Sequence, residues 1–342
     1  MKEFATYASH RQEGMLLNAN EYSENVDDAL MEKIKDAVAM VMLNRYPDTT
    51  QAALLKAYSK VVGLGEGMLL AGNGSDQMLG YMIARHLAKG KKLYTLAPDF
   101  SMYDYYASSY EADVVRFKTN EDGDFDIDAF IEKGLRENVD MVMFSNPNNP
   151  TGHFVGSEGI EKIAYAFQDI PFVCDEAYVE FASLPSSVTL IERHPNLFVT
   201  RTLSKAYGLA GLRVGFLCGN EQAMQKLREA YVPYALNSVS MKIAETVLDA
   251  CGDMHERIEM IKSEREKMQE WLKECRGLEA FPSQANFIYV KAQGKDKLMA
   301  LFKDEGISVR DYAQSPYLRI TVGLPRENES VRNVIAKYEE GL

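Results

Sequence analysis

Residues 141–152 read Met-Val-Met-Phe-Ser-Asn-Pro-Asn-Asn-Pro-Thr-Gly, an apolar stretch that passes directly into a polar segment with two prolines and a glycine. The first four residues show no alternation of apolar and polar side chains. This pattern is typical of a strand that helices cover on both faces. The polar segment carries the residue types of a loop. The stretch therefore predicts a buried strand of a parallel sheet, followed by a loop at its carboxyl end.

Similar β-rich runs alternate with helical patterns between about residues 50 and 220, and together they predict a mostly parallel seven-stranded α/β sheet. The other six runs are 68–71, 92–96, 114–117, 171–174, 197–200 and 214–217. Beyond residue 236 a long charged amphipathic stretch runs from about Ser238 to Cys275, and a last helix begins after Pro325. Strands expected around 286–290 and 317–322 complete a smaller α/β unit. We expect an N-terminal arm (1–25), a large domain (26–236) and a small C-terminal domain (237–342).

Composition excludes several classes of function. The 342 residues are 46% hydrophobic and 26% charged, with a formal net charge of -12. This charge repels nucleic acid and anionic lipid surfaces. The first residues contain no apolar signal segment, and the longest apolar run, 37–43, is far shorter than the roughly 20 residues of a membrane span. The four cysteines form no C-x-x-C pair and the histidines show no ligand spacing. We expect a cytoplasmic protein without a metal.

Polar residues follow four of the predicted strands, at 72–77, 146–152, 175–178 and 201–205. In open parallel sheets, ligands bind outside the carboxyl ends of the strands. The sequence therefore predicts that these four segments meet in one site.

The first of these segments, Gly72 to Gln77, places flexible backbone at the start of a helix. Free N–H groups and the helix dipole favour an anion such as phosphate at this position. A tight turn with Ser75 as the N-cap explains the same residues without any ligand.

Asp175 and Lys205 each admit two interpretations. An ionised Asp175 at the end of a buried strand must face a cation, such as a protonated pyridine nitrogen, or else it belongs to a surface loop or a structural ion pair. Lys205 follows two hydroxyl residues and precedes Arg213. A lysine with a basic neighbour and little solvation can attack a carbonyl and form a Schiff base, whereas most lysines are solvated surface charges.

Read together, four motifs resemble the pyridoxal-phosphate-dependent aminotransferases of fold type I, class I/II. They are Asn149 to Gly152, Asp175 to Tyr178, Thr202 to Lys205 and Gly211 to Gly215. Further segments are similar to those of histidinol-phosphate aminotransferases, and the resemblance covers nearly the whole chain. These segments are Leu17 to Tyr22, Asn44 to Asp48, Asn146 to Gly152 and Tyr317 to Gly323.

The resemblance implies how pyridoxal phosphate is bound. Lys205 would hold it as an internal aldimine, and Asp175 would pair with its pyridine nitrogen N1. Asn149 and Tyr178 would hydrogen-bond the ring 3-oxygen, and Phe100 would lie against the ring. The residues implied for the cofactor phosphate are Gly74, Ser75, Asp76, Thr202, Ser204, Arg213 and Tyr46 of the partner subunit, which makes the protein a homodimer.

The resemblance also implies the substrates. Arg319 matches the arginine that binds a carboxylate and Arg310 the arginine that binds the substrate phosphate, with Tyr7, Asn20 and Asn149 completing the pocket. Histidinol phosphate has no carboxylate. We therefore expect the two arginines to share its phosphate in one half-reaction and the carboxylates of glutamate in the other.

The reaction expected from these residues is a ping-pong transamination with 2-oxoglutarate, as in histidine biosynthesis. The catalytic residues would be Lys205, Asp175 and Tyr178, and Lys205 would move a proton from the substrate Cα to C4' of the cofactor. An aromatic amino acid aminotransferase and a threonine-phosphate decarboxylase on the same fold are alternatives. A non-catalytic nucleotide- or anion-binding α/β protein is an alternative of a different class.

Overall fold

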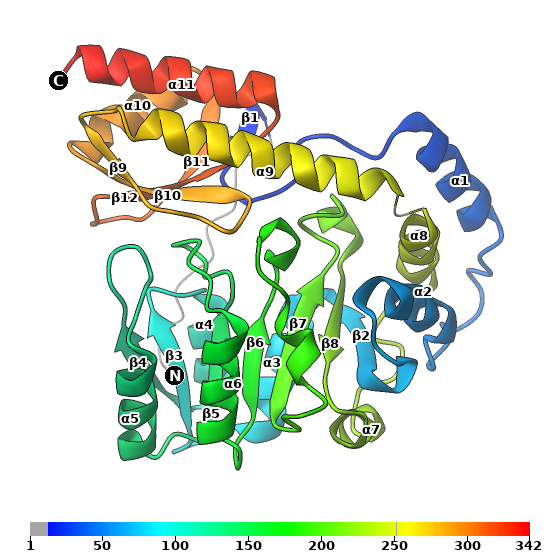
Figure 1. The fold of residues 1–342 in the computed structure, drawn as a ribbon. Helices are drawn as coiled ribbons and strands as arrows, with labels where there is room; N and C mark the ends of the chain where they lie inside the picture. Colours follow the sequence, from blue (N-terminus) through cyan, green and yellow to red (C-terminus); the bar gives the residue numbers. More distant parts are fainter. Residues whose placement is uncertain (1–12, 251) are drawn as a thin grey trace.

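The computed structural model describes residues 13–250 and 252–342, and it contains two β-sheets flanked by helices (Figure 1). The larger sheet has seven strands in the order β2-β8-β7-β6-β5-β3-β4. They are β2 (Leu69–Asn73), β3 (Lys92–Ala97), β4 (Asp113–Lys118), β5 (Met141–Ser145), β6 (Phe172–Asp175), β7 (Leu197–Thr202) and β8 (Val214–Cys218). All seven predicted strands are confirmed. The sheet is parallel except for β8, which is antiparallel to both of its neighbours.

Helices cover both faces of this sheet, which explains why central strands such as β5 and β6 show no alternation of apolar and polar residues. Alternate side chains of one strand enter two different cores: Val173 of β6 packs on one side and Cys174 on the other. The first face carries α3 (Gly74–His86), α4 (Met102–Ser109) and α7 (Glu221–Glu229). The second face carries α2 (Ala52–Val62), α5 (Ile127–Glu137) and α6 (Ser157–Ala166). Short 3-10 turns complete the unit: η1 (Glu66–Met68), η2 (Val179–Phe181), η3 (Ser187–Leu190) and η4 (Ala210–Leu212).

Helix α3 begins two residues earlier than a Ser75 N-cap requires. Its first residue is Gly74 and its N-cap is Asn73, so the interpretation of Ser75 as the N-cap is wrong. Gly74 has φ +80° and a Cβ at this position would lie 2.7 Å from the Arg213 guanidinium. Because glycine accepts both constraints, the chain can turn directly from β2 into α3.

The second sheet has five strands in the order β1-β11-β12-β10-β9. They are β1 (Met15–Leu17), β9 (Leu278–Ala280), β10 (Phe287–Ala292), β11 (Ile307–Asp311) and β12 (Tyr317–Thr321), with α10 (Lys295–Asp304) and α11 (Pro325–Glu340) packed beside them. The strands expected near 286–290 and 317–322 and the helix after Pro325 are confirmed. Strand β1, from the other end of the chain, pairs in parallel with β11.

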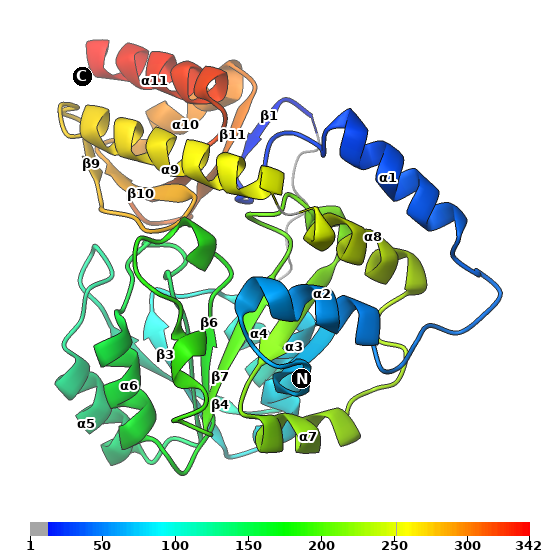
Figure 2. The same cartoon turned by 45° about the vertical axis from the view of Figure 1, so that its right-hand side comes forward.

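The stretch from Ser238 to Cys275 forms two helices, α8 (Ser238–Asp249) and α9 (Gly252–Leu272), rather than one continuous element. Helix α8 packs against α1 (Asp28–Ala39) and α2, whereas α9 lies along the second sheet (Figure 2). Glycine is a poor helix former, and Gly252 stands near the break. The division at residues 25 and 236 stays a prediction. Within the described residues, no helix combines the length and the apolar character that crossing a membrane requires.

Candidate active site

The segments that follow β2, β5, β6 and β7 leave the same edge of the seven-stranded sheet, because these four strands run in one direction. Strand β3 is parallel to them and brings residues 98–100 to this edge. Strand β8 runs the opposite way, so that its start, next to Arg213, lies here as well. The second sheet lies beyond this edge (Figure 1). The expected convergence of polar segments is therefore confirmed.

Asp175 is a buried carboxylate at the end of β6. Its Oδ1 accepts a hydrogen bond of 2.8 Å from the Thr200 hydroxyl, and its Oδ2 accepts one of 2.9 Å from the Tyr103 hydroxyl. Burial raises the pKa of Asp175 to about 6, although both hydroxyl donors act in the opposite direction. No ion pair to Asp175 occurs among the described residues. A cation placed beside this carboxylate would therefore be stabilised strongly.

Lys205 follows β7 and is largely buried with its amine inside the site. Its Nζ donates a hydrogen bond of 2.7 Å to the Ala19 carbonyl and lies 5.9 Å from the ring centroid of Tyr178. Burial, followed by the positive charge of Arg319, lowers the pKa of Lys205 to about 8. Near neutral pH this amine thus has a larger uncharged fraction than an ordinary lysine, and the uncharged form is the nucleophilic and basic one.

Tyr178 and Asn149 lie between these groups and the second sheet. The Asn20 side-chain amide donates a hydrogen bond of 3.1 Å to the Tyr178 hydroxyl. Arg319, on β12, donates to the Asn149 side-chain oxygen and, at 2.8 Å, to the Asn18 carbonyl. Burial raises the pKa of Tyr178, so its hydroxyl keeps its proton. The N-terminal segment, the large sheet and the second sheet therefore meet at one point.

Polar groups gather where α3 meets β8. The Arg213 guanidinium lies 3.1 Å from Asp76, and the Thr202 hydroxyl donates a 2.9 Å hydrogen bond to the Ser204 hydroxyl. A Cβ at Gly215 would lie 2.2 Å from the Ser75 nitrogen, so only glycine lets α3 begin this close to β8. The first N–H groups of a helix have no partner within the helix. This corner is thus a candidate anion site.

Arg310 and Arg319 are directly paired across β11 and β12, which places both side chains on the same face of the second sheet. Arg319 is buried and its Nε has no hydrogen-bond partner within the described part of the chain.

Tyr46 is 82% exposed and its ring stacks on Tyr234 of the same chain at 4.7 Å. Tyr7 lies outside the described residues.

The sequence analysis did not identify several residues of the site. Thr200 and Tyr103 hold Asp175, and Phe100 packs edge-on against Tyr103 at 5.6 Å. Asp99 accepts hydrogen bonds from the Ser145 hydroxyl and, at 2.8 Å, from the Phe100 N–H. Burial raises the pKa of Asp99 to about 8. The only sequence signal for Thr200 and Asp175 being neighbours is that Thr200 ends the predicted run 197–200 and Asp175 follows the predicted run 171–174. This signal becomes usable only when the order of the strands in the sheet is known.

These groups define a class of protein. The site combines a buried lysine of lowered pKa, a buried carboxylate without a cation and a candidate anion site on the edge of an α/β sheet. Within the described ranges, no group of residues could hold a metal. This set suits nucleophilic chemistry on a carbonyl, with a bound anionic group as the anchor. Residues 12–335 match the family model for aminotransferases of class I and II. The chain belongs to this family.

Curated relatives agree over nearly the full length. The chain is 37% identical to a histidinol-phosphate aminotransferase of Clostridium kluyveri over 94% of this chain and 92% of the relative. It is 34% identical to a histidinol-phosphate aminotransferase of Chlorobaculum tepidum over 94% of this chain and 93% of the relative.

Solved structures share the fold. A histidinol-phosphate aminotransferase from Sinorhizobium meliloti, in complex with pyridoxal-5'-phosphate, aligns with a TM-score of 0.86 at 23% identity over 96% of this chain and 91% of its own. An L-threonine-O-3-phosphate decarboxylase from Porphyromonas gingivalis aligns with a TM-score of 0.81 at 22% identity over 95% and 99%. The fold alone therefore does not separate the aminotransferase from the decarboxylase.

Proposed function

We propose that this protein is a pyridoxal-phosphate-dependent aminotransferase that converts histidinol phosphate with 2-oxoglutarate as the amino acceptor, in the biosynthesis of histidine in the cytoplasm. The observation that carries the proposal is the buried Lys205 amine, with its pKa lowered to about 8, at the same sheet edge as the buried Asp175. The histidinol-phosphate aminotransferases at 37% and 34% identity support the substrate.

The residues present fit pyridoxal phosphate. Its ring nitrogen needs an acid partner, and Asp175 is a buried carboxylate held by two hydroxyl donors with no ion pair in the described part of the chain. Its phosphate needs N–H and hydroxyl donors, which the start of α3, Thr202, Ser204 and Arg213 offer. Its aldehyde needs an amine, and Lys205 is the amine of the site.

Each residue then has a role. Lys205 would bind the cofactor aldehyde, Asp175 the ring nitrogen, and Asn149 and Tyr178 the ring 3-oxygen, with Phe100 against the ring. The phosphate would lie on residues that share donor groups at the α3–β8 corner: Gly74, Ser75, Asp76, Thr202, Ser204 and Arg213. When bound, pyridoxal phosphate supplies an electron sink for the electron pair left at the substrate Cα.

The chain itself supplies the proton transfer. The Lys205 Nζ would act as the base, because its pKa of about 8 lies close to physiological pH, where proton transfer is most efficient. The Ala19 carbonyl accepts a hydrogen bond from Nζ and fixes its position. Asp175, ionised above about pH 6, would hold a proton on the ring nitrogen of the cofactor.

The substrate end of the site would consist of Arg319, Arg310, Asn20 and Asn149, with Tyr7 proposed from the resemblance. A guanidinium binds phosphate and carboxylate groups in the same bidentate manner. Two adjacent arginines can therefore bind the phosphate of histidinol phosphate and, in the second half-reaction, the carboxylates of glutamate.

A substrate panel tests the amino donor. We expect purified protein loaded with pyridoxal phosphate to produce glutamate from 2-oxoglutarate with L-histidinol phosphate at a kcat/KM at least about tenfold above that with phenylalanine, the size of preference that one well-placed charged group provides. Faster turnover of phenylalanine would indicate an aromatic aminotransferase, and release of carbon dioxide from threonine phosphate a decarboxylase. A colourless preparation that binds no cofactor would indicate a non-catalytic protein. Each of these results would contradict the proposal.

We also propose that the protein is a homodimer with shared sites. The segment between α1 and α2 exposes four large apolar or aromatic side chains: Met40 at 80%, Met42 at 67%, Leu43 at 81% and Tyr46 at 82%. Such a cluster on a surface marks an interaction site. A second copy that covers it would receive Tyr46 near its cofactor phosphate.

Replacement of Tyr46 by alanine tests this arrangement. We expect the dissociation constant of pyridoxal phosphate to rise about tenfold, the effect of losing one hydrogen bond to a charged group. The control is Tyr165→Ala, which removes a tyrosine that is 70% exposed on α6. Equilibrium titration measures the affinity for the cofactor, and analytical ultracentrifugation measures the oligomeric state. Equal cofactor affinities for both variants, or a monomeric wild-type protein at micromolar concentration, would refute the shared site.

A further inference from the structure

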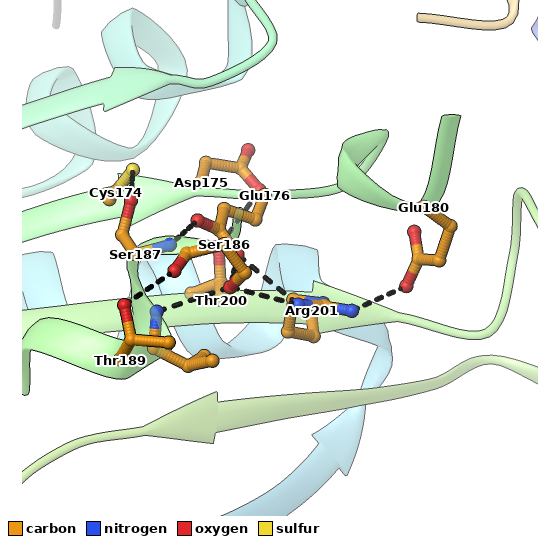
Figure 3. Close-up of polar contacts among 10 residues, drawn as sticks. Cys174, Asp175, Glu176, Glu180, Ser186, Ser187, Thr189, Thr200 and Arg201 are labelled. Atoms are coloured by element: carbon orange, nitrogen blue, oxygen red, sulfur yellow. Dashed lines mark hydrogen bonds and ion pairs between the residues drawn. The ribbon is translucent and has the colours of Figure 1, made fainter. Parts of the chain in front are cut away.

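A buried cluster of three charged side chains, Arg201, Glu176 and Glu180, lies next to Asp175 and Thr200 (Figure 3). Arg201 of β7 donates through Nη1 to Glu176 at 3.2 Å and through Nη2 to Glu180 at 2.8 Å. The Arg201 side chain is 9% exposed, that of Glu176 0% and that of Glu180 10%. Glu176 also accepts hydrogen bonds from the Ser186 hydroxyl at 2.5 Å and from the Ser187 N–H at 2.6 Å.

The cluster and Asp175 lie on opposite faces of the sheet. Asp175 and Thr200 are paired neighbours in β6 and β7, and Thr200 donates to Asp175. Glu176 and Arg201 are the next residues along the chain, and because successive side chains of a strand alternate, they belong to the other face. Arg201 thus links β7 to the segment after β6 on the face of the sheet opposite Asp175.

The two glutamates flank Tyr178 in the sequence. Glu176 begins the segment 176–180 and Glu180 lies in η2, so that one guanidinium binds both ends of a five-residue segment with Tyr178 at its centre. The Tyr178 ring packs edge-on against Phe287 at 5.0 Å and its hydroxyl accepts the bond from Asn20. Both of these contacts come from the N-terminal segment and the second sheet. On the large-sheet side, the Glu176 N–H donates a backbone hydrogen bond of 3.0 Å to the Thr200 carbonyl, and Arg201 adds side-chain contacts at both ends of the segment.

Stability alone is a weak reason for such a cluster. Two carboxylates and one guanidinium leave one negative charge in excess, and Arg201 Nε and Glu180 Oε2 have no hydrogen-bond partner in the described ranges. Burying ions costs solvation free energy, and well-packed apolar side chains of the same volume are often as stable. Such a network of ion pairs instead holds the segment 176–180 in one conformation.

We propose that Arg201, Glu176 and Glu180 form a clamp that positions the Tyr178 hydroxyl for the ring oxygen of the cofactor. The inference rests on the proposed function of this site. Arg201 is a positioning residue: it acts through the segment 176–180 and contacts neither substrate nor cofactor.

Arg201→Met tests the clamp, with Arg193→Met as the matched control because Arg193 is 61% exposed and pairs with Glu161. In cofactor-free protein, we expect hydrogen exchange of the backbone amides in 176–182 to become at least about tenfold faster in Arg201→Met, as expected for a segment released from one face. Arg193→Met should exchange like the wild type. Arg201→Lys, which keeps the charge, should recover part of the protection.

The loaded protein gives a second readout. A hydroxyl that donates to the ring oxygen stabilises its anionic form, so weakening this bond raises the pH at which the absorbance of the bound cofactor changes, by roughly one unit. We expect this rise in Arg201→Met, together with a fall in kcat of up to about 10²-fold at a nearly unchanged KM. In a double-mutant cycle, Tyr178→Phe should mask most of the Arg201→Met effect.

Several results would overturn the clamp. They are unchanged exchange in 176–182, an unchanged absorbance midpoint in Arg201→Met, or effects of Arg201→Met and Tyr178→Phe that simply add. If Arg201→Met does not fold, Glu180→Gln removes one charge at similar volume and should shift exchange and absorbance in the same directions. Wild-type protein without a pH-dependent cofactor absorbance would refute the proposed function instead, whereas faster exchange in cofactor-free Arg201→Met would still support the clamp.

Discussion

Replacing Lys205 by alanine is expected to lower kcat by about 10⁴-fold or more while the fold is retained. Lys205 would serve twice, as the amine that binds the cofactor aldehyde and as the base that moves the Cα proton, and proton transfer by a positioned group alone contributes about 10²–10⁴-fold. Removing a buried amine whose charged form is disfavoured by burial should not destabilise the protein. Steady-state kinetics with histidinol phosphate and 2-oxoglutarate, and a thermal melt, measure both expectations.

Two further variants make the Lys205 result specific. Lys205→Arg keeps a positive charge but offers no nucleophilic amine at neutral pH, so it should be as inactive as Lys205→Ala. Lys35→Ala removes a lysine that is 62% exposed and pairs with Glu32 three residues earlier, and its turnover should equal that of the wild type. Near-normal turnover in Lys205→Ala would end the account.

Asp175→Asn is expected to reduce kcat by at least about 10²-fold and at the same time to stabilise the cofactor-free protein at neutral pH. The loss of activity follows because an amide cannot keep a proton on the ring nitrogen, and the electron sink then weakens. The gain in stability follows because the wild-type carboxylate is buried in ionised form without a cation, a state that costs free energy.

The pH dependence of this gain has a definite sign. The pKa of Asp175 is about 6 in the folded protein and near 3.8 when unfolded. Between these values the folded state holds the extra proton, so the stability that Asp175 confers falls as the pH rises from 4 to 6 and stays low above 6. The free energy of unfolding of Asp175→Asn should exceed that of the wild type by about 1–3 kcal/mol at pH 7.5, and the difference should vanish near pH 4.

Asp140→Asn is the matched control for Asp175→Asn. Asp140 is 25% exposed and pairs with Lys91 at 2.6 Å, so neutralising it removes a favourable contact and should lower stability by up to about 1 kcal/mol. Denaturant melts of cofactor-free protein at pH 4 and 7.5 compare the variants. A less stable Asp175→Asn at pH 7.5, or one with normal turnover, would contradict the role assigned to this carboxylate.

The sequence predicts the seven-stranded sheet well because burial on both faces leaves a signal in the central strands themselves. The run Met141 to Phe144 and the run Phe172 to Cys174 are apolar without alternation, and the structure places them as neighbouring strands. The polar residues after each run are also visible in the sequence. The convergence of these segments follows from strand direction alone.

Contacts between distant segments leave no comparable signal. Strand β1 has three residues and pairs with β11 almost three hundred residues later. The Arg319 contacts with Asn149 and the Asn18 carbonyl join three parts of the chain. The break between α8 and α9 depends on which surface each helix covers, because one packs against α1 and α2 and the other against the second sheet. Such features require the assembled fold.

The central claim is that the Lys205 amine carries the cofactor, and chemical trapping tests it most directly. Wild-type protein loaded with pyridoxal phosphate is reduced with borohydride, digested with trypsin and analysed by mass spectrometry. We expect one modified peptide, Thr202 to Arg213, uncleaved at Lys205 and heavier by one reduced cofactor. A cofactor fixed to a different lysine, or to none, would contradict the account.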